Sequence, residues 1–276
     1  MKFKPEIKNP THDAVVELID KAMQAKNNEQ PKRKYLGASR IGDGCSRKLA
    51  YEYHMTEKDP GAEFKGTTLR MFDMGHDGEA RVAEYLRIAG FELQTHTPDG
   101  RQIGISDLEG KFKGHLDGVV QGGPEIPGLK YPMLWENKAL GVSSFKDVVN
   151  KGIKESKPIY YAQVQIYMGY YNLESCLFTC LNRDTAEINV EVIPFDSRDC
   201  QDYIDKVAVI VSTLDPEEIP RPYTDPSDYR CKVMCDFRER CWDRKAPPQD
   251  PMQSFDINFL KPKTNTESTP SWPLKK

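Results

Sequence analysis

The stretch of sequence that decides the fold runs from Lys111 to Leu140 and reads KFKGHLDGVVQGGPEIPGLKYPMLWENKAL. Its two ends, 111–120 and 131–140, have the composition and alternation typical of strands. The segment between them, QGGPEIPGLK, is rich in glycine and proline and predicts a hairpin loop. The stretch therefore predicts two neighbouring strands joined by a loop.

Polar residues of opposite charge fall on these two strands. Because successive side chains of a strand point to opposite faces, Asp117 is expected to share a face with His115. By the same rule Glu136 and Lys138 share a face with Leu134. If the strands are neighbours, Asp117, Glu136 and Lys138 converge at one spot.

Two carboxylates at one spot repel each other, and a hard divalent cation relieves that repulsion. Mg²⁺ accepts one or two protein carboxylates together with water and a substrate phosphate. Upstream, His76 and Glu79 are three residues apart on a predicted helix and share one of its faces, so they are candidates for a third ligand. Each of these pieces alone is common on a solvated surface, and only their order along the chain favours a site.

Helical and strand patterns alternate around the hairpin. The spacing of apolar residues predicts helices over 11–27, 45–55, 67–89, 158–172 and 197–213. Strands are predicted over 91–97, 101–107, 111–120, 131–140, 175–182 and 186–195. Gly90 is suited to end the third helix and Asp196 to begin the last one. The pattern predicts one mixed α/β domain with helical ends.

This ordered series resembles the PD-(D/E)xK nuclease superfamily, in its RecB-like and phage-exonuclease branch. Asp117 and Glu136-Asn137-Lys138 match the core signature, although Leu and not Pro precedes the aspartate, and His76 matches an upstream helix histidine. The resemblance covers roughly residues 36–242. It implies a restriction-endonuclease-like core, in which helices flank a mixed central sheet.

The resemblance also implies roles for individual residues. Asp117, Glu136 and Lys138 would be catalytic. The ligands of Mg²⁺ or Mn²⁺ would be His76, Asp117, Glu136 and the main-chain carbonyl of Asn137, with Glu79 as a further candidate. Gln163 and Tyr167, four residues apart on one helix face, match a motif of lambda-type viral recombination exonucleases that supports the site or contacts DNA.

The seven cysteines are an odd number, and three of them fall in one run, Cys231, Cys235 and Cys241. The chain has no export signal at its N-terminus, so such a run favours a metal or cluster over disulfides. The segment around Cys45 resembles the N-terminal cysteine motif of RecB-type nucleases that carry an iron–sulfur cluster. That resemblance implies a four-cysteine clasp holding [4Fe–4S], with structural Zn²⁺ as the alternative. The remaining cysteines are expected to be core thiols.

The charge balance is 39 Lys and Arg against 42 Asp and Glu, a net charge of −3, which excludes a polybasic protein. Local basic groups can still neutralise phosphates. The candidates are Lys32, Arg33, Lys34, Arg47, Lys48, Lys146, Lys151, Lys154 and Lys157. Arg47 and the run at 146–157 are favoured because they flank the predicted site.

The leading hypothesis is a metal-dependent exonuclease that processes DNA ends, single- or double-stranded, in phage or mobile-element recombination or repair. Such a protein could work with a single-strand annealing protein. The alternatives are an end-trimming nuclease of the CRISPR-adaptation type and a non-catalytic module that binds DNA ends. Cleavage polarity and oligomeric state stay open.

Three parts are expected along the chain. Residues 1–35 form an N-terminal helix and basic loop, 36–245 form the nuclease domain with both cysteine segments, and 246–276 form a Pro-rich tail. No apolar stretch is long enough to span a membrane. A soluble, cytoplasmic protein is therefore expected, in the host cytoplasm if the source is viral.

Overall fold

The computed structural model describes residues 9–31 and 33–243. The predicted Pro-rich tail at 246–276 lies outside the described residues. The helices are α1 Pro10–Asn28, α2 Ser46–Tyr53, α3 Gly66–Ile88, α4 Val142–Ser156, α5 Pro158–Tyr171, α6 Ser197–Ser212, α7 Tyr229–Lys232 and α8 Arg238–Asp243. The strands are β1 Leu36–Gly37, β2 Leu93–Gln94, β3 Gly104–Asp107, β4 Phe112–His115, β5 Gly118–Val120, β6 Met133–Leu140, β7 Ser175–Asn182 and β8 Ile188–Pro194.

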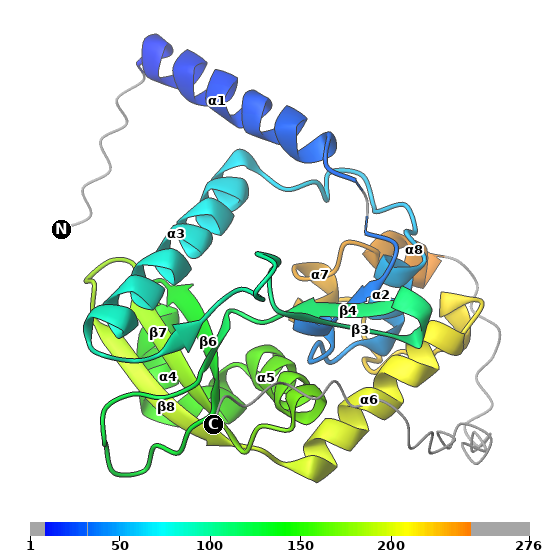
Figure 1. Cartoon of the computed structure of the whole chain (residues 1–276). Helices are drawn as coiled ribbons and strands as arrows, with labels where there is room; N and C mark the ends of the chain where they lie inside the picture. Colours follow the sequence, from blue (N-terminus) through cyan, green and yellow to red (C-terminus); the bar gives the residue numbers. More distant parts are fainter. Residues whose placement is uncertain (1–8, 32, 244–276) are drawn as a thin grey trace. The chain divides into compact units, whose positions relative to one another are not determined.

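The strands form two sheets, which we call the large and the small sheet (Figure 1). The large sheet has five strands in the order β2-β5-β6-β7-β8, and it is mixed because β6 runs antiparallel to β5 but parallel to β7. The small sheet has three strands in the order β1-β4-β3. Helices flank the large sheet, so the predicted mixed α/β fold with a mixed central sheet is confirmed.

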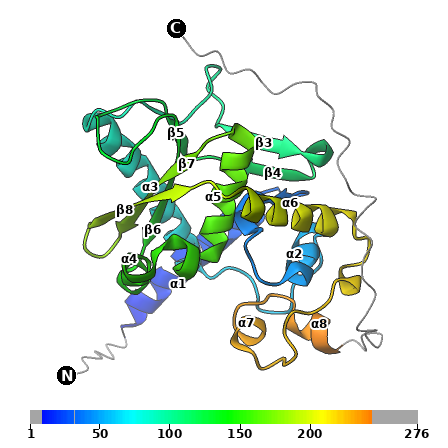
Figure 2. The ribbon, with the colours of Figure 1, turned by 90° about the horizontal axis from the view of Figure 1, so that it is seen from below.

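Two helices cover opposite faces of the large sheet (Figure 2). Helix α3 packs on the face of β6 that carries Trp135 and Ala139, where a Cβ added at Gly78 would lie 3.0 Å from that of Ala139. Helix α5 packs on the other face, where Gln163 contacts Glu136. The glycine lets α3 approach the sheet closely, which brings the middle of this helix next to the start of β5.

A prediction follows for this close approach. Gly78→Val adds a branched side chain where the Cβ alone already meets Ala139, so the free energy of unfolding is expected to fall by about 2 kcal/mol. Gly75→Val, one turn earlier on α3, is the matched control because nothing lies within 4 Å of its Cβ position. Urea denaturation of the two variants makes the comparison, and equal midpoints would contradict the packing described.

The predicted strand at 111–120 is two strands, which corrects the sequence analysis. Its first half, β4, belongs to the small sheet, and its second half, β5, belongs to the large sheet. His115 is exposed whereas Asp117 is only 9% exposed, so these two side chains do not share a face. A Cβ at Gly118 would lie 2.8 Å from the Gln94 carbonyl oxygen, so only glycine allows the close approach of β2 where β5 begins.

Helix α4 is absent from the sequence-based prediction and joins β6 to α5. It buries Phe145, Val148 and Ile153, and a left-handed Gly152 (φ 74°) interrupts it before the last turn. The loop at 121–130 does join the antiparallel strands β5 and β6, as predicted. The predicted cap is also confirmed, because the Asp196 carboxylate accepts hydrogen bonds from the N–H groups of Arg198 and Asp199 at the start of α6.

The core has two parts. The larger part lies between the sheets and helices α2, α5 and α6, and the smaller part lies under α3. Among the described residues, no helix is both long and apolar enough to cross a membrane.

Candidate active site and cysteine cluster

The predicted catalytic residues meet where β5 begins beside the middle of β6. Asp117 precedes β5, and its Oδ2 accepts a hydrogen bond of 2.8 Å from the main-chain N–H of Asn137. This bond ties the aspartate to the strand that carries Glu136 and Lys138. The convergence expected from neighbouring strands is therefore present, although Asp117 reaches it from the junction between the two sheets.

Glu136 is fully buried, at 0% exposure, and its two carboxylate oxygens differ. Oε1 contacts the Lys138 ammonium and accepts a hydrogen bond of 2.7 Å from Nε2 of Gln163. Oε2 has no hydrogen-bond partner among the described residues. A buried, unsatisfied polar atom costs about 1–3 kcal/mol, and more when it is charged. This oxygen is therefore a site where a ligand would gain binding energy.

The electrostatics of the site show that its carboxylates crowd one another. Burial and the charge of Asp117 raise the pKa of Glu136 to about 8 and that of Glu79 to about 7. Burial also raises the pKa of Asp117, although Lys138 opposes the shift. For Lys138, the carboxylates of Glu136 and Asp117 outweigh burial, and its pKa lies above the usual value. Lys138 thus stays an ammonium, but its single positive charge does not balance the three carboxyl groups of Glu79, Asp117 and Glu136.

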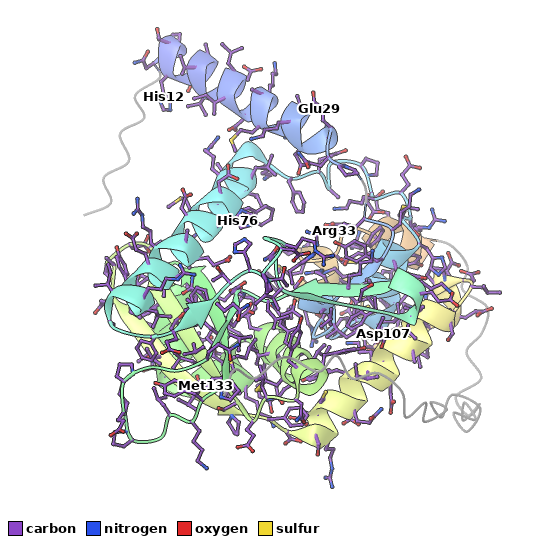
Figure 3. All side chains as sticks on the ribbon, in the orientation of Figure 1. His12, Glu29, Arg33, His76, Asp107 and Met133 are labelled. Atoms are coloured by element: carbon purple, nitrogen blue, oxygen red, sulfur yellow. The ribbon has the colours of Figure 1, made fainter. Side chains whose placement is uncertain are left out.

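Helix α3 contributes His76 and Glu79 to the same spot, with His76 midway along the helix (Figure 3). His76 is close enough to lower the pKa of Asp117, and Glu79 is close enough to raise that of Glu136. Sequence reasoning ranked His76 above Glu79. In the structure Glu79 is the more buried of the two and faces both carboxylates, whereas His76 is exposed.

Two observations bear on whether these residues suit a divalent cation. Within the described ranges, no three His, Cys, Asp or Glu side chains stand in an arrangement that could hold a metal ion as they are placed. The chemistry of the donors suits one nevertheless. Three carboxylates with raised pKa values and one orphaned buried oxygen are oxygen ligands of the kind that Mg²⁺ and Mn²⁺ take. The N–H of Asn137 faces Asp117, and its carbonyl faces the same strand edge.

A series of hydrogen bonds between side chains of β6 and β7 was not predicted from the sequence. Trp135 Nε1 donates to Thr179 Oγ1 at 3.1 Å, and Thr179 Oγ1 donates to Asn137 Oδ1 at 2.9 Å. Thr179 lies on β7, directly beside Asn137 in the parallel register. It therefore anchors the strand segment between the catalytic residues. A threonine in an otherwise apolar strand is the sequence feature that could have indicated such a role. Its partner, Asn137, can be identified only from the register of the two strands.

Gln163 and Tyr167 lie on α5 as the motif implies, and both are buried, with Tyr167 at 1% exposure. Tyr167 forms a hydrogen bond with Gln163, which in turn holds Glu136. The ring of Tyr167 also contacts the small sheet, where it would meet a Cβ added at Gly114. Both residues are thus placed to support the site and not to contact DNA.

The four cysteines of the predicted clasp line one cavity, although they are up to 196 positions apart in the chain (Cys45, Cys231, Cys235 and Cys241). All are free thiols. An N–H donor lies next to each sulfur. The main-chain N of Lys48 is 3.4 Å from Cys45, and Nη1 of Arg47 is 3.9 Å from Cys241. Trp242 is the donor next to Cys231, and the main-chain N of Phe237 is the donor next to Cys235. Burial raises the pKa of Cys235 to about 11, so its thiolate needs a compensating charge.

Helices α2, α7 and α8 lie side by side around this cavity (Figure 2). The Asp59 N–H donates to the Asp236 carbonyl at 2.7 Å, and the Asp59 carboxylate accepts from the N–H of Glu239 at 2.8 Å. The rings of Tyr51 and Phe237 pack with centroids 5.2 Å apart. Protein contacts therefore already join the two ends of the domain.

Arg47 is not placed to contact DNA, which corrects that part of the sequence analysis. It is 3% exposed, and its guanidinium donates to the carbonyls of Ile219 at 2.5 Å and Glu217 at 2.7 Å. Its charge faces Cys241 instead. The physical reason is that α2 packs this side chain inward, against the segment that leads to the cysteine run.

Three lysines of the 146–157 run are paired with acids. Lys151 and Lys157 contact Asp147 at 3.0 and 3.1 Å, and Lys154 contacts Asp199 at 2.7 Å. Such pairs leave less free positive charge for phosphates than the sequence suggests. This run is therefore a weaker candidate for DNA contact than its composition indicates.

Comparison with known proteins finds no matching family model and no matching curated protein. Among solved structures, the chain is similar to an alkaline exonuclease from Laribacter hongkongensis, with 16% identity, 70% of this chain and 91% of that chain covered, and a TM-score of 0.46. It is also similar to SSO0001, with 15% identity, 81% and 94% coverage and a TM-score of 0.46. A third similar structure is a phage-related exonuclease from Haemophilus somnus 129PT, with 15% identity, 60% of this chain and 76% of that chain covered, and a TM-score of 0.38. At such low similarity, the chemistry has to be argued from the site.

Proposed function

We propose that this protein is a metal-dependent deoxyribonuclease that hydrolyses phosphodiester bonds. The observation that carries the proposal is the buried Oε2 of Glu136, which has no partner among the described residues, in a carboxylate whose pKa the neighbouring Asp117 raises. Crowded carboxylates next to one fixed ammonium are the arrangement expected for binding a cation and a phosphate together. DNA as the substrate rests on the resemblance of the motif series to PD-(D/E)xK nucleases.

The residues that would hold Mg²⁺ or Mn²⁺ are His76, Glu79, Asp117, Glu136 and the carbonyl of Asn137. When bound, such an ion would lower the pKa of a water molecule and stabilise charge on the phosphate.

The other roles belong to the chain itself. Lys138 keeps its proton and so presents hydrogen-bond donors and a point charge to the attacking water or to a phosphate oxygen. Its Nζ lies 5.4 Å from the ring centroid of Tyr160, which limits the directions in which the side chain can point. Gln163 donates a hydrogen bond to one oxygen of Glu136, and the other oxygen has no partner among the described residues.

The finer proposal is an exonuclease that acts on DNA ends in phage or mobile-element recombination or repair, with a single-strand annealing protein as a further partner. The helix carrying Gln163 and Tyr167 supports the lambda-type over the CRISPR-adaptation type. The intact set of Asp117, Glu136 and Lys138 supports an enzyme over a non-catalytic module that binds DNA ends.

A time course on linear DNA labelled separately at its 5′ and 3′ ends, with and without Mg²⁺, tests the proposal. Loss of label as mononucleotides from one end, only with the metal, is expected. Trimming restricted to short overhangs would favour the CRISPR-adaptation type. DNA binding without any metal-dependent cleavage would contradict the nuclease function and favour the non-catalytic module that binds DNA ends.

Gln163→Leu is expected to lower the cleavage rate about 10–100-fold, because Glu136 loses the hydrogen bond that orients it. Leucine keeps the volume in this buried position, so the protein should remain folded.

Gln165→Leu is not a suitable control for this variant, because the Gln165 side chain forms hydrogen bonds with main-chain groups of Pro194 and Asp196. Gln201→Leu on the exposed face of α6 is suitable. A rate equal to that of the wild type in Gln163→Leu would remove Gln163 from the site.

We also propose that Cys45, Cys231, Cys235 and Cys241 hold a [4Fe–4S] cluster with a structural role. The N–H donors around the sulfurs and the cationic side chains of Arg47, Lys48, Arg221 and Arg238 that line the cavity support it. These groups would balance the negative charge of four thiolates. Zn²⁺ is the alternative, and metal analysis of the purified protein distinguishes the two, since iron and a broad absorbance near about 400 nm accompany the cluster.

A further inference from the structure

One face of the small sheet carries basic side chains that the proposed active site does not use. Phe112 and Gly114 of β4 point toward α5, since Phe112 is buried and a Cβ at Gly114 would meet Tyr167. Lys113 and His115 alternate with them and therefore point to the opposite face. We call this opposite face of β1-β4-β3 the outer face.

Arg33 also lies on the outer face, close to β4 (Figure 3). Gly37 of β1 is the register partner of Lys113, so a Cβ at Gly37 would point to the same face as that lysine. The Nη1 atom of Arg33 lies 3.9 Å from this Cβ position. The guanidinium thus covers Gly37 next to Lys113.

Two further side chains of the outer face are held in a similar way. The Nζ atom of Lys113 lies 5.4 Å from the ring centroid of Tyr35. The imidazole of His115 covers its register partner Gly104, at 3.0 Å from the Cβ position of that glycine. The glycines thus leave room for the side chains of Arg33 and His115 to lie against the sheet.

The positive charge of the outer face is not neutralised by the part of the chain that the structure describes. None of the ion pairs between those residues includes Arg33 or Lys113. The register neighbours Gly37, Gly104 and Ser106 carry no charge. This contrasts with the 146–157 run, whose lysines are paired with Asp147 and Asp199.

The outer face lies next to the candidate active site along the chain. His115 precedes Asp117 by two residues at the junction between the two sheets, and two residues span at most about 7 Å. A polyanion that lies on Lys113 and His115 would therefore reach the carboxylates through its neighbouring phosphate.

We propose that the outer face binds the sugar–phosphate backbone of the DNA strand adjacent to the bond that is hydrolysed, through Arg33, Lys113 and His115. The inference rests on the proposed nuclease function and names the surface that guides its substrate. Lys and Arg neutralise phosphates and release condensed counterions on binding, whereas the sequence of the bases is not read.

The test is the affinity of the full-length protein for a fluorescein-labelled single-stranded oligonucleotide in EDTA, where cleavage does not occur. Arg33→Ala/Lys113→Ala is expected to raise Kd about tenfold at moderate salt, and to reduce the slope of log K against log salt by about 0.7 for each lost phosphate contact. With Mg²⁺, KM should rise about as much as Kd while kcat is unchanged, because no group at the reacting bond is altered.

Two controls accompany the double variant. Lys111→Ala, at the end of the same hairpin, and Lys151→Ala/Lys154→Ala, whose lysines are paired with acids, should bind like the wild type. Lys113→Arg keeps the charge and should retain the affinity. If the double variant fails to fold, as judged by circular dichroism, the single variants Arg33→Gln and Lys113→Gln replace it and should each raise Kd.

The outcomes separate this inference from the proposed function. Wild-type affinity and salt slope in the folded variants would overturn the outer face as a DNA surface, even if cleavage is normal. Absence of cleavage by the wild type, with affinity still lost in Arg33→Ala/Lys113→Ala, would overturn the nuclease function and keep the DNA surface.

Discussion

Replacing Glu136 with glutamine is expected to lower Mg²⁺-dependent degradation of linear DNA about 100- to 1,000-fold. Glu136 is the acid of the site that has a buried carboxylate oxygen, Oε2, without a hydrogen-bond partner among the described residues. Glutamine keeps the size and can still accept hydrogen bonds from Lys138 and Gln163, but it removes the charge that a cation requires. The measurement is the rate of nucleotide release from end-labelled DNA.

The fold of this variant should be unaffected. Because the substitution relieves the repulsion between Glu136 and Asp117, the free energy of unfolding should change by less than about 1 kcal/mol or rise. Glu84→Gln, on the exposed surface of α3, is the control and should cleave DNA at the wild-type rate. A Glu136→Gln protein that still degrades DNA like the wild type would show that the site lies elsewhere.

The second large effect is expected at the cysteine cluster. Cys235→Ala should yield a colourless, poorly soluble protein without iron, because three thiolates cannot complete the proposed four-cysteine ligand set, which would tie the two ends of the domain together. Protein contacts such as those of Asp59, Phe237 and Lys48 would then hold the C-terminal segment against α2 without the metal. Iron content per chain, absorbance and the soluble fraction after expression are the measurements.

Cys200→Ala is the matched control for this change. Cys200 is a buried thiol against Gly169 of α5, away from the cavity of the clasp, and its loss should leave iron content unchanged. Zinc in place of iron in the wild type would assign the site to Zn²⁺. A wild-type protein with neither metal would contradict the cluster altogether.

Several features could be predicted from local pattern because their causes are local. The hairpin around 121–130 follows from its glycines and prolines, and the start of α6 follows from Asp196. The alternation along β6 correctly separated Glu136 from Trp135, since a strand has a period of two wherever it pairs. The approach of Asp117 to this strand followed from pairing the two strands as neighbours.

Other features depend on contacts between distant segments, which local pattern does not contain. The strand predicted over 111–120 divides between two sheets because β4 pairs with β1 and β3 whereas β5 pairs with β2 and β6, and this separates His115 from Asp117. Arg47 is as basic as any surface arginine, but carbonyls about 170 residues away accept its hydrogen bonds. The same holds for Thr179, whose partners lie on another strand.

The sequence by itself therefore determined which residues can carry the chemistry, because residue type and order decide the available carboxylates, lysine and thiols. The tertiary structure decided how they are used. Burial leaves one oxygen of Glu136 without a partner among the described residues, and packing turns Arg47 toward the cysteines. The pairing of the small sheet places Lys113 next to Arg33 on the outer face. The physical reason is that desolvation and hydrogen bonding act on groups brought together from distant parts of the chain, and that proximity exists only in the folded protein.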